Sequence, residues 1–404
     1  MERLRQAGIN ARGRIGWETD GIKARLAFEA AVLDARRSLA ASFASIDPAC
    51  PLLSARARLF GPSWADLLYH LLRRGVSVSI ALDATEGAEA ATALAAITQA
   101  AEAGGLAGRL TVTRLSHPAA RAEGGCWPFG LFPRGHRQAL ALVDDRRLFL
   151  SAAPTGAQTG RRLFLSAEGP VVAEARRHLD GFAAFTAGVG PVPPAQRLLR
   201  TLSCPRPGLA GPIAPRRLAN EVETAHSMLL RRAQRLVYLE TQSFDCLGLA
   251  RNFAQRAAAA PQLGLILILP ETEPAGRSWL DRLRQRQALA ILARAFAARL
   301  FVGLAPGGCA NVTLFDEEAA IAGSADLSRR ALRVETHAGL YLRRGDDVAG
   351  LRNALMRHWL PEAAGEGFFD PVRAVSAWRE LAQENARTGV TGARVLLPDS
   401  RLRS

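Results

Sequence analysis

Residues 309–326 read CANVTLFDEEAAIAGSAD, and this stretch gives the clearest indication of the fold. Apolar runs on both sides of the acidic segment 316–318 predict two short strands joined by an acidic turn. Gly323 and Ser324 follow the second predicted strand. The order of strand, acidic turn, strand and Gly-Ser is distinctive enough to compare with known motifs.

The stretch resembles the second signature of the phospholipase D superfamily, His-x-Lys-x-x-x-x-Asp followed after six residues by Gly-Ser-x-Asn. In this alignment Asp316 keeps the aspartate position, whereas Cys309 takes the histidine position and Asn311 the lysine position. Ser324 keeps the serine, and Asp326 stands where the signature has asparagine. The spacing is therefore kept, while the nucleophile and the cation are replaced.

An earlier stretch, GHRQALALVDD at 135–145, matches the same pattern in the first half of the chain. Aligned on Asp144 without gaps, Arg137 takes the histidine position and Ala139 the lysine position, and the tail reads Ser-Ala-Ala-Pro. His136 lies one residue out of register. Because neighbours in a strand point to opposite faces, we expect His136 on the surface or on the face away from the site.

The likeness to the superfamily extends over residues 20–362. RLVYLETQSF at 235–244 is similar to the family segment IYIENQYF. LLYHLLRRGVSVSIALD at 67–83 resembles the helix, Arg-Arg-Gly turn and strand of bacterial phospholipase D enzymes. In that family one histidine attacks phosphorus and a second protonates the leaving alcohol, while lysines and asparagines hold the phosphate oxygens. The resemblance thus implies a phosphodiester substrate and one active site assembled from two halves.

The replacements at the catalytic positions argue against that mechanism. Arg137 stays protonated and cannot attack phosphorus, and Asn311 donates hydrogen bonds without charge. Cys309 is the remaining nucleophile, provided that its pKa is depressed so that a thiolate forms. The alternative is that Cys309 is a small residue filling a vacated site. Among groups that act as a unit, losing one removes nearly all catalysis, so we expect the ordinary mechanism to be absent.

The other candidate residues have weaker support. His136 could serve as a catalytic base only if a bulge shifts the strand register. Asp144 and Asp316 stand at the aspartate positions of the two signatures, but ordinary strand-turn geometry explains them and is favoured, because the histidines they would orient are replaced. Candidate phosphate ligands, by position in the signatures, are Arg137, Asn311 and Ser324.

Composition indicates a globular, basic protein. The chain has 404 residues, 49% of them hydrophobic, which is enough for two domains with separate cores. Its net charge is +15, and Lys23 is the one lysine, so arginine carries the charge. The excess predicts an anionic partner such as a phospholipid surface, a phosphodiester or a nucleic acid. The preference for arginine also fits the codon usage of a GC-rich genome.

No metal site or cofactor is predicted, because the five cysteines are scattered and form no C-x-x-C pair. The N-terminus lacks an apolar segment of signal length, and no apolar run approaches the roughly 18 residues of a membrane span. We therefore expect a cytoplasmic protein, with peripheral attachment to a membrane as a further expectation.

Strands and helices alternate in the same order in both halves. This alternation predicts an α/β fold of two phospholipase D-like lobes related by a pseudo-two-fold, each with a mostly parallel sheet flanked by helices. A Pro/Gly-rich stretch between the halves is typical of a linker that crosses the surface. The predicted boundaries are a first lobe at 1–190, a linker at 191–218, a second lobe at 219–362 and a C-terminal appendage at 363–404.

Three functions remain open at this point. The first is a catalytically degenerate phospholipase D-like protein that binds phospholipid or another phosphodiester, or that partners an active paralogue. The second is an active phospholipase D or cardiolipin synthase-type phosphatidyltransferase that uses displaced residues. The third is a nucleic-acid-binding protein, which is disfavoured because the positive charge is spread along the chain. Whether the chain is an enzyme is thus left undecided by its sequence.

Overall fold

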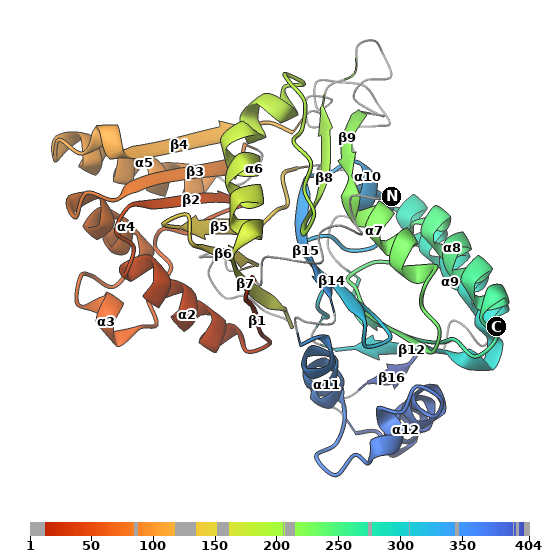
Figure 1. Cartoon of the computed structure of the whole chain (residues 1–404). Coiled ribbons are helices and arrows are strands. Elements are labelled where there is room, and N and C mark those ends of the chain that lie inside the picture. The colour runs from red at the N-terminus through yellow and green to blue at the C-terminus, as the bar shows by residue number, and fades with distance from the viewer. Residues whose placement is uncertain are drawn as a thin grey trace. The chain divides into compact units, whose positions relative to one another are not determined.

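The computed structural model describes residues 13–84, 88–117, 135–151, 161–204, 206, 215–273, 277–306, 308–343, 347–390, 392 and 396–399. The chain divides into two compact units (Figure 1). Unit 1 consists of Met1–Gln158, Phe164–Ala219 and Val334–Gly339, and unit 2 of Thr159–Leu163, Asn220–Arg333 and Leu340–Ser404. Among the helices of the described part, none is long and apolar enough to span a membrane.

Unit 1 contains a sheet with the strand order β1-β7-β6-β5-β2-β3-β4. Its strands are β1 Ile15–Glu18, β2 Ser38–Phe43, β3 Ser77–Asp83, β4 Leu110–Leu115, β5 Leu140–Val143, β6 Arg147–Leu150 and β7 Phe164–Glu168. Its helices are α2 Gly21–Leu33, α3 Ala55–Arg58, α4 Trp64–Arg73, α5 Ala88–Ala103 and α6 Pro170–Thr186, with a 3-10 turn at Ala107–Arg109.

The core of unit 1 follows from alternation along β2 and β3. Residues at every second position of β3, such as Val78 and Ile80, are buried together with Trp64 and Leu68 of α4 and Phe28 of α2. The capping box of Ser63 starts α4, as expected for a serine followed three residues later by an acidic residue. Helix α6 packs against β5, β6 and β7, and Figure 1 shows it lying across the sheet.

Unit 2 contains strands in the order β16-β12-β11-β10-β13-β14. They are β10 Leu236–Glu240, β11 Gly264–Pro270, β12 Leu300–Ala305, β13 Val312–Phe315, β14 Ala319–Gly323 and β16 Leu397–Pro398. The helices of this unit are α7 Glu221–Leu230, α8 Leu247–Ala259, α9 Trp279–Phe296, α10 Arg329–Arg333, α11 Val348–Trp359 and α12 Ala374–Thr388, with 3-10 turns at Ala297–Arg299 and Glu366–Phe368.

Both sheets are mixed, which corrects the expectation of mostly parallel sheets while confirming the α/β class. In unit 1, β2 and β3 are parallel, as are β3 and β4, but the other neighbours run antiparallel. In unit 2, β10, β11 and β12 are parallel, whereas β13 and β14 pair antiparallel. The physical reason is that the acidic turns join their strands as tight hairpins, which only antiparallel strands allow.

The predicted linker contains ordered structure. Within it, β8 Leu198–Cys204 is buried along its whole length, and β9 Arg216–Asn220 begins near its end. Glu174 of α6 accepts hydrogen bonds from the backbone N–H groups of Gln196, Arg197 and Leu198 at 2.9–3.1 Å, which fixes the start of β8 in unit 1. The expectation of a surface linker is therefore wrong for residues 198–204, because all seven residues of β8 are buried, including the polar Arg200, Thr201 and Ser203.

The segment after residue 362 packs onto unit 2. The predicted amphipathic helix is α12, and its Trp378 lies against the rings of Tyr238 and Phe301 at centroid distances of 5.8 and 6.1 Å. Strand β16 pairs with β12. Strand β15, His337–Arg343, begins in unit 1 and ends in unit 2. The predicted domain boundaries otherwise remain a prediction.

Candidate functional site

Asp316 holds together the closed end of the β13–β14 hairpin. It follows β13 directly and has a φ of 53°, a left-handed conformation that aspartate tolerates better than most residues. Its carboxylate accepts hydrogen bonds from the backbone N–H groups of Gln234, Arg235 and Leu236, all at 2.9 Å. Asp316 therefore caps the start of β10 and lies at the end of the hairpin remote from Cys309.

Asp144 makes the same arrangement in unit 1. Its φ is 54°, and its carboxylate accepts from the backbone N–H groups of Arg36, Arg37 and Ser38 at 2.7–3.1 Å. Burial tends to raise the pKa of Asp144, but these three hydrogen bonds outweigh it and hold the pKa below its usual range. The carboxylates of both signature aspartates are thus occupied by backbone.

The two hairpins also share one register at their open ends. In unit 2 the N–H of Gly323 donates to the carbonyl of Asn311, and in unit 1 the N–H of Ser151 donates to the carbonyl of Ala139. Counting from these pairs places Arg137 in unit 1 at the position that Cys309 takes in unit 2. The remainder of the Ser-Ala-Ala-Pro tail, residues 152–154, lies outside the described residues.

Cys309 is buried at the open end of the unit 2 hairpin, with 1% of its surface exposed. Its thiol donates to the carbonyl of Thr241 at 3.2 Å. Burial raises the pKa of the Cys309 thiol well above its usual range, and the nearby Glu240 carboxylate raises it further. A thiol in this environment is neutral near pH 7, so it lacks the thiolate character that attack on phosphorus requires.

Asn311 and Ser324 lie together at the same end. The Asn311 side chain accepts from the N–H of Gln242 at 3.1 Å and donates through Nδ2 to the carbonyl of Ser324 at 3.2 Å. The side chain of Gln242 donates in turn to the carbonyl of Cys309. These amides form a neutral, half-buried polar edge with hydrogen-bond donors where the signature would have lysine.

A buried ion pair lies beneath this edge. Arg161 donates from Nε and Nη2 to the two oxygens of Glu240 at 2.9 and 3.0 Å, with side-chain exposures of 4% and 0%. Glu240 also accepts from the hydroxyl of Tyr238 at 2.6 Å, from Nε1 of Trp359 at 3.2 Å and from the N–H of Ala310 at 3.1 Å. The one cation beside Cys309 in the described contacts is therefore already neutralised by a carboxylate.

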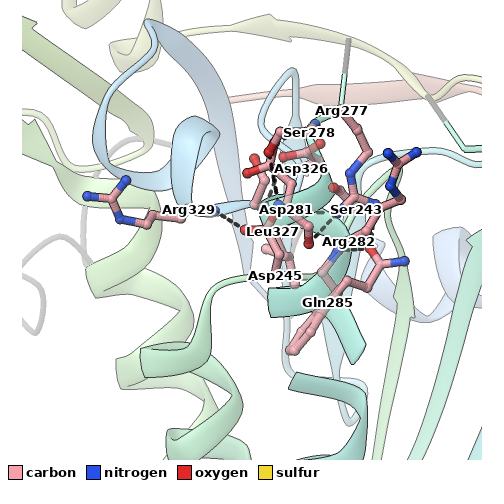
Figure 2. Close-up of polar contacts among 12 residues, drawn as sticks. Ser243, Asp245, Arg277, Ser278, Asp281, Arg282, Gln285, Asp326, Leu327 and Arg329 are labelled. Atoms are coloured by element: carbon pink, nitrogen blue, oxygen red, sulfur yellow. Dashed lines mark hydrogen bonds and ion pairs between the residues drawn. The ribbon is translucent and has the colours of Figure 1, made fainter. Parts of the chain in front are cut away.

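A second polar cluster connects the tail of the unit 2 signature to α9 (Figure 2). Asp245 accepts from the N–H of Arg329 at 2.7 Å and pairs with Arg277 at 3.4 Å. Arg277 also donates to Gln285 at 2.8 Å. Burial raises the pKa of Asp245 to about 6, and the neighbouring Asp326 carboxylate adds to the rise. This cluster joins three chain segments, one of which follows Ser324.

In unit 1, His136 is buried, so of the two expected places, the surface or the face away from the site, the surface is excluded. Its Nδ1 is 2.8 Å from the hydroxyl of Thr336, and its backbone N–H donates to Asp83. Gln138 is buried like His136, while Arg137 and Ala139 are half-buried, as alternation along an extended segment predicts. The N–H of Arg137 donates to the carbonyl of Thr336 at 2.9 Å.

A second histidine lies beside His136. The ring of His117 is 5.1 Å from that of His136, centroid to centroid, and its Nε2 is 3.0 Å from the carbonyl of Val334. Burial lowers the pKa of each histidine to about 4. Both rings are enclosed, with exposures of 0% and 1%. They are neutral, packed histidines, and Nε2 of His136 has no hydrogen-bond partner among the described residues.

Several of these residues were not predicted from the sequence. Asp83 ends an apolar strand, and the carboxyl ends of parallel strands are where α/β proteins place polar sites, so its position was a usable signal. Glu240 lies in the segment similar to IYIENQYF. Arg161 and His117 carried no local signal, because their partners are far away in the sequence. No cluster of three or more His, Cys, Asp or Glu among the described residues could hold a metal ion.

Comparison with known proteins gives structural likenesses. No family model matches the chain, and no curated protein matches it. The structure is similar to phosphatidylserine synthase from Haemophilus influenzae Rd KW20, with a TM-score of 0.59 and 11% identity over 98% of this chain and 99% of that one. It is also similar to polyphosphate kinase from Porphyromonas gingivalis, with a TM-score of 0.51 and 11% identity over 96% of this chain and 57% of that one.

At this level of identity the likenesses establish the fold. The match to phosphatidylserine synthase covers nearly the whole of either chain, so it includes both sheets and their flanking helices. The chain therefore has the two-sheet α/β fold found in phosphatidylserine synthase and polyphosphate kinase, as the phospholipase D-like signatures predict.

Proposed function

We propose that this chain binds a phosphodiester, in the first place an anionic phospholipid, and that it does not carry out the two-histidine displacement of phospholipase D. The fold supports the class of ligand by analogy with phosphatidylserine synthase. The state of the signature residues supports the absence of that reaction.

The proposal that the displacement reaction is absent rests mainly on Cys309. A nucleophile must be ionised and accessible, whereas the Cys309 thiol is 1% exposed, lies beside Glu240 and has a raised pKa. The nearby cation Arg161 does not depress the thiol pKa enough to offset this, because Glu240 neutralises it. A displacement at phosphorus also requires a general acid, and His136 is enclosed and neutral.

Binding remains chemically reasonable without catalysis. We propose Asn311 and Ser324, at the open end of the unit 2 hairpin, as phosphate ligands within unit 2. Considered separately, Arg137 is proposed as a phosphate ligand of unit 1. Hydrogen bonds from amides and arginine to phosphate oxygens supply affinity without a nucleophile. Such a protein would act as a lipid-binding or regulatory partner, for example of an active paralogue.

The test combines turnover with binding. Purified protein is assayed for hydrolysis and headgroup exchange on vesicles of phosphatidylcholine and phosphatidylglycerol, and for calorimetric binding of soluble dihexanoyl phosphatidylglycerol. We expect no turnover and measurable binding. Asn311→Asp adds a negative charge without changing shape and should weaken binding, whereas the control Asn252→Asp, on α8, should not.

Turnover by the wild type would contradict the proposal. If turnover then disappeared in Cys309→Ala but not in Cys246→Ala, which removes another buried thiol of unit 2, a cysteine would have replaced the family's histidine. If turnover survived Cys309→Ala, the alignment of the signatures would be wrong, and His136→Ala would be the next variant. Binding of a nucleic acid in place of the lipid would favour the third function.

A further inference from the structure

The outward face of the first turns of α9 carries large apolar side chains beside arginines. Trp279 is 68% exposed and Leu283 is 42% exposed. Arg282 and Arg286 are exposed too, and residues three, four and seven apart on a helix lie on one face. An exposed Trp and Leu one turn apart, flanked by arginines, are typical of a helix face that meets a membrane surface.

The inward face of the same turns is anchored. Asp281 forms a capping box with Ser278: the N–H of Ser278 donates to the Asp281 carboxylate, and the N–H of Asp281 donates to the Ser278 hydroxyl, both at 3.0 Å. Gln285 accepts from the N–H of Phe244 at 3.2 Å and from Arg277. Figure 2 shows Arg277, Ser278, Asp281 and Gln285 clustered with Asp326, in the tail of the unit 2 signature. The exposed side chains therefore lie on helical turns whose inward face is hydrogen-bonded to neighbouring segments of unit 2.

We propose that the α9 face, formed by Trp279, Arg282, Leu283 and Arg286, docks on an anionic phospholipid surface. The inference rests on the proposed function and deepens it, since it names the surface from which a lipid headgroup is presented. An indole combines an apolar ring with an N–H donor and suits the headgroup level of a membrane. Arginines near that surface are attracted to anionic lipids, and the net charge of +15 adds to the attraction.

Nearby carboxylates neutralise the charges of Arg282 and Arg286 only weakly. Glu273 approaches Arg282 at 3.6 Å, but both side chains are partly exposed, at 34% and 50%, and such surface pairs are weak. Asp281 is buried within its capping box and faces away from the exposed side. Arg286 is exposed one turn further along. The face therefore favours an anionic lipid surface over an uncharged one.

Vesicle sedimentation tests this assignment. On vesicles of phosphatidylcholine containing phosphatidylglycerol, Trp279→Ala and Leu283→Ala should each lower the partition coefficient about tenfold, as expected for withdrawing part of a large apolar side chain from lipid. Arg286→Gln should lower it about fivefold on these vesicles and have little effect on pure phosphatidylcholine. The fluorescence of the wild type should shift to the blue on binding, and Trp279→Phe should abolish most of that shift.

Matched controls lie elsewhere on unit 2. Val372→Ala removes a side chain that is 85% exposed, and Arg294→Gln removes an exposed charge from the same helix. Both controls should bind vesicles like the wild type. Because the substituted side chains are exposed, folding should be preserved, and circular dichroism checks this.

The outcomes separate this inference from the proposed function. If the wild type binds soluble dihexanoyl phosphatidylglycerol but its vesicle binding does not depend on Trp279 and Leu283, the α9 face is refuted and the proposed function stands. If it binds neither the soluble lipid nor vesicles, both are refuted. If the substitutions instead abolish self-association or binding of a protein, the face meets protein and the inference is wrong.

Discussion

Replacing Arg161 by methionine should destabilise unit 2 by about 4 kcal/mol. Breaking a buried ion pair by removing one partner costs about 3–5 kcal/mol, because the other charge stays buried. Glu240 would retain hydrogen bonds from Tyr238, Trp359 and Ala310, which limits the loss. The carbonyl of Leu355 would lose its bond from Arg161, at a cost of about 1 kcal/mol.

Urea unfolding followed by tryptophan fluorescence measures this loss, since Trp359 and Trp378 are buried in unit 2 and report on it. Adding Glu240→Gln to Arg161→Met removes the uncompensated charge and keeps an acceptor for Tyr238, so the double variant should be more stable than Arg161→Met alone. As a control, Arg387→Met removes an arginine that pairs with Glu384 at 2.6 Å on the surface, and it should leave the midpoint unchanged.

The effect should also depend on pH. In the wild type burial tends to raise the pKa of Glu240, but Arg161 outweighs it and the pKa lies below 4.5. A depressed carboxyl pKa contributes stability above the unfolded value, and this stability is lost as the pH falls through the folded value. Without Arg161, burial raises the pKa instead, so the difference between variant and wild type should grow from pH 5 to pH 7.5. A loss below about 1 kcal/mol, or a loss independent of pH, would refute the reasoning.

Three further predictions follow from the contacts. Asp316→Ala and Asp144→Ala should each destabilise the protein by about 2 kcal/mol in urea unfolding, since three backbone N–H groups lose a charged acceptor in each variant. Lipid binding measured by calorimetry should stay intact, and a loss of binding at full stability would instead indicate a role in the site. Burial lowers the pKa of His226 from 6.5 to about 4, so folding is favoured by its neutral form above pH 6.5, and about 2 kcal/mol of this stability is lost by pH 5. His226→Gln should therefore flatten the stability curve between pH 6.5 and pH 5, and an unchanged slope would contradict the burial argument. Cys309 should resist iodoacetamide at pH 7.5 until the protein is unfolded, as mass spectrometry would show, and rapid labelling of the folded protein would mean an accessible thiolate.

Local features of the sequence were sufficient to predict most of the elements. The apolar runs at 76–83 and 263–271 correspond to β3 and β11, and the two acidic segments form the turns of the β5–β6 and β13–β14 hairpins. These signals are local, because strand periodicity and turn chemistry depend on neighbouring residues. The burial of β8 could not be predicted in the same way, since its surroundings of proline and glycine resemble a loop.

The sequence by itself determined the α/β class, the repeated hairpins and the positions of Cys309 and Asn311 within them. Only the tertiary structure decided what those positions can do. Arg161 reaches Glu240 across 79 residues of chain, and His117 approaches Val334 across 217. Desolvation and charge pairing depend on such distant contacts, and they set the protonation of Cys309 and His136. The sequence therefore shows which residues stand at the signature positions, whereas their protonation and burial follow only from the folded units.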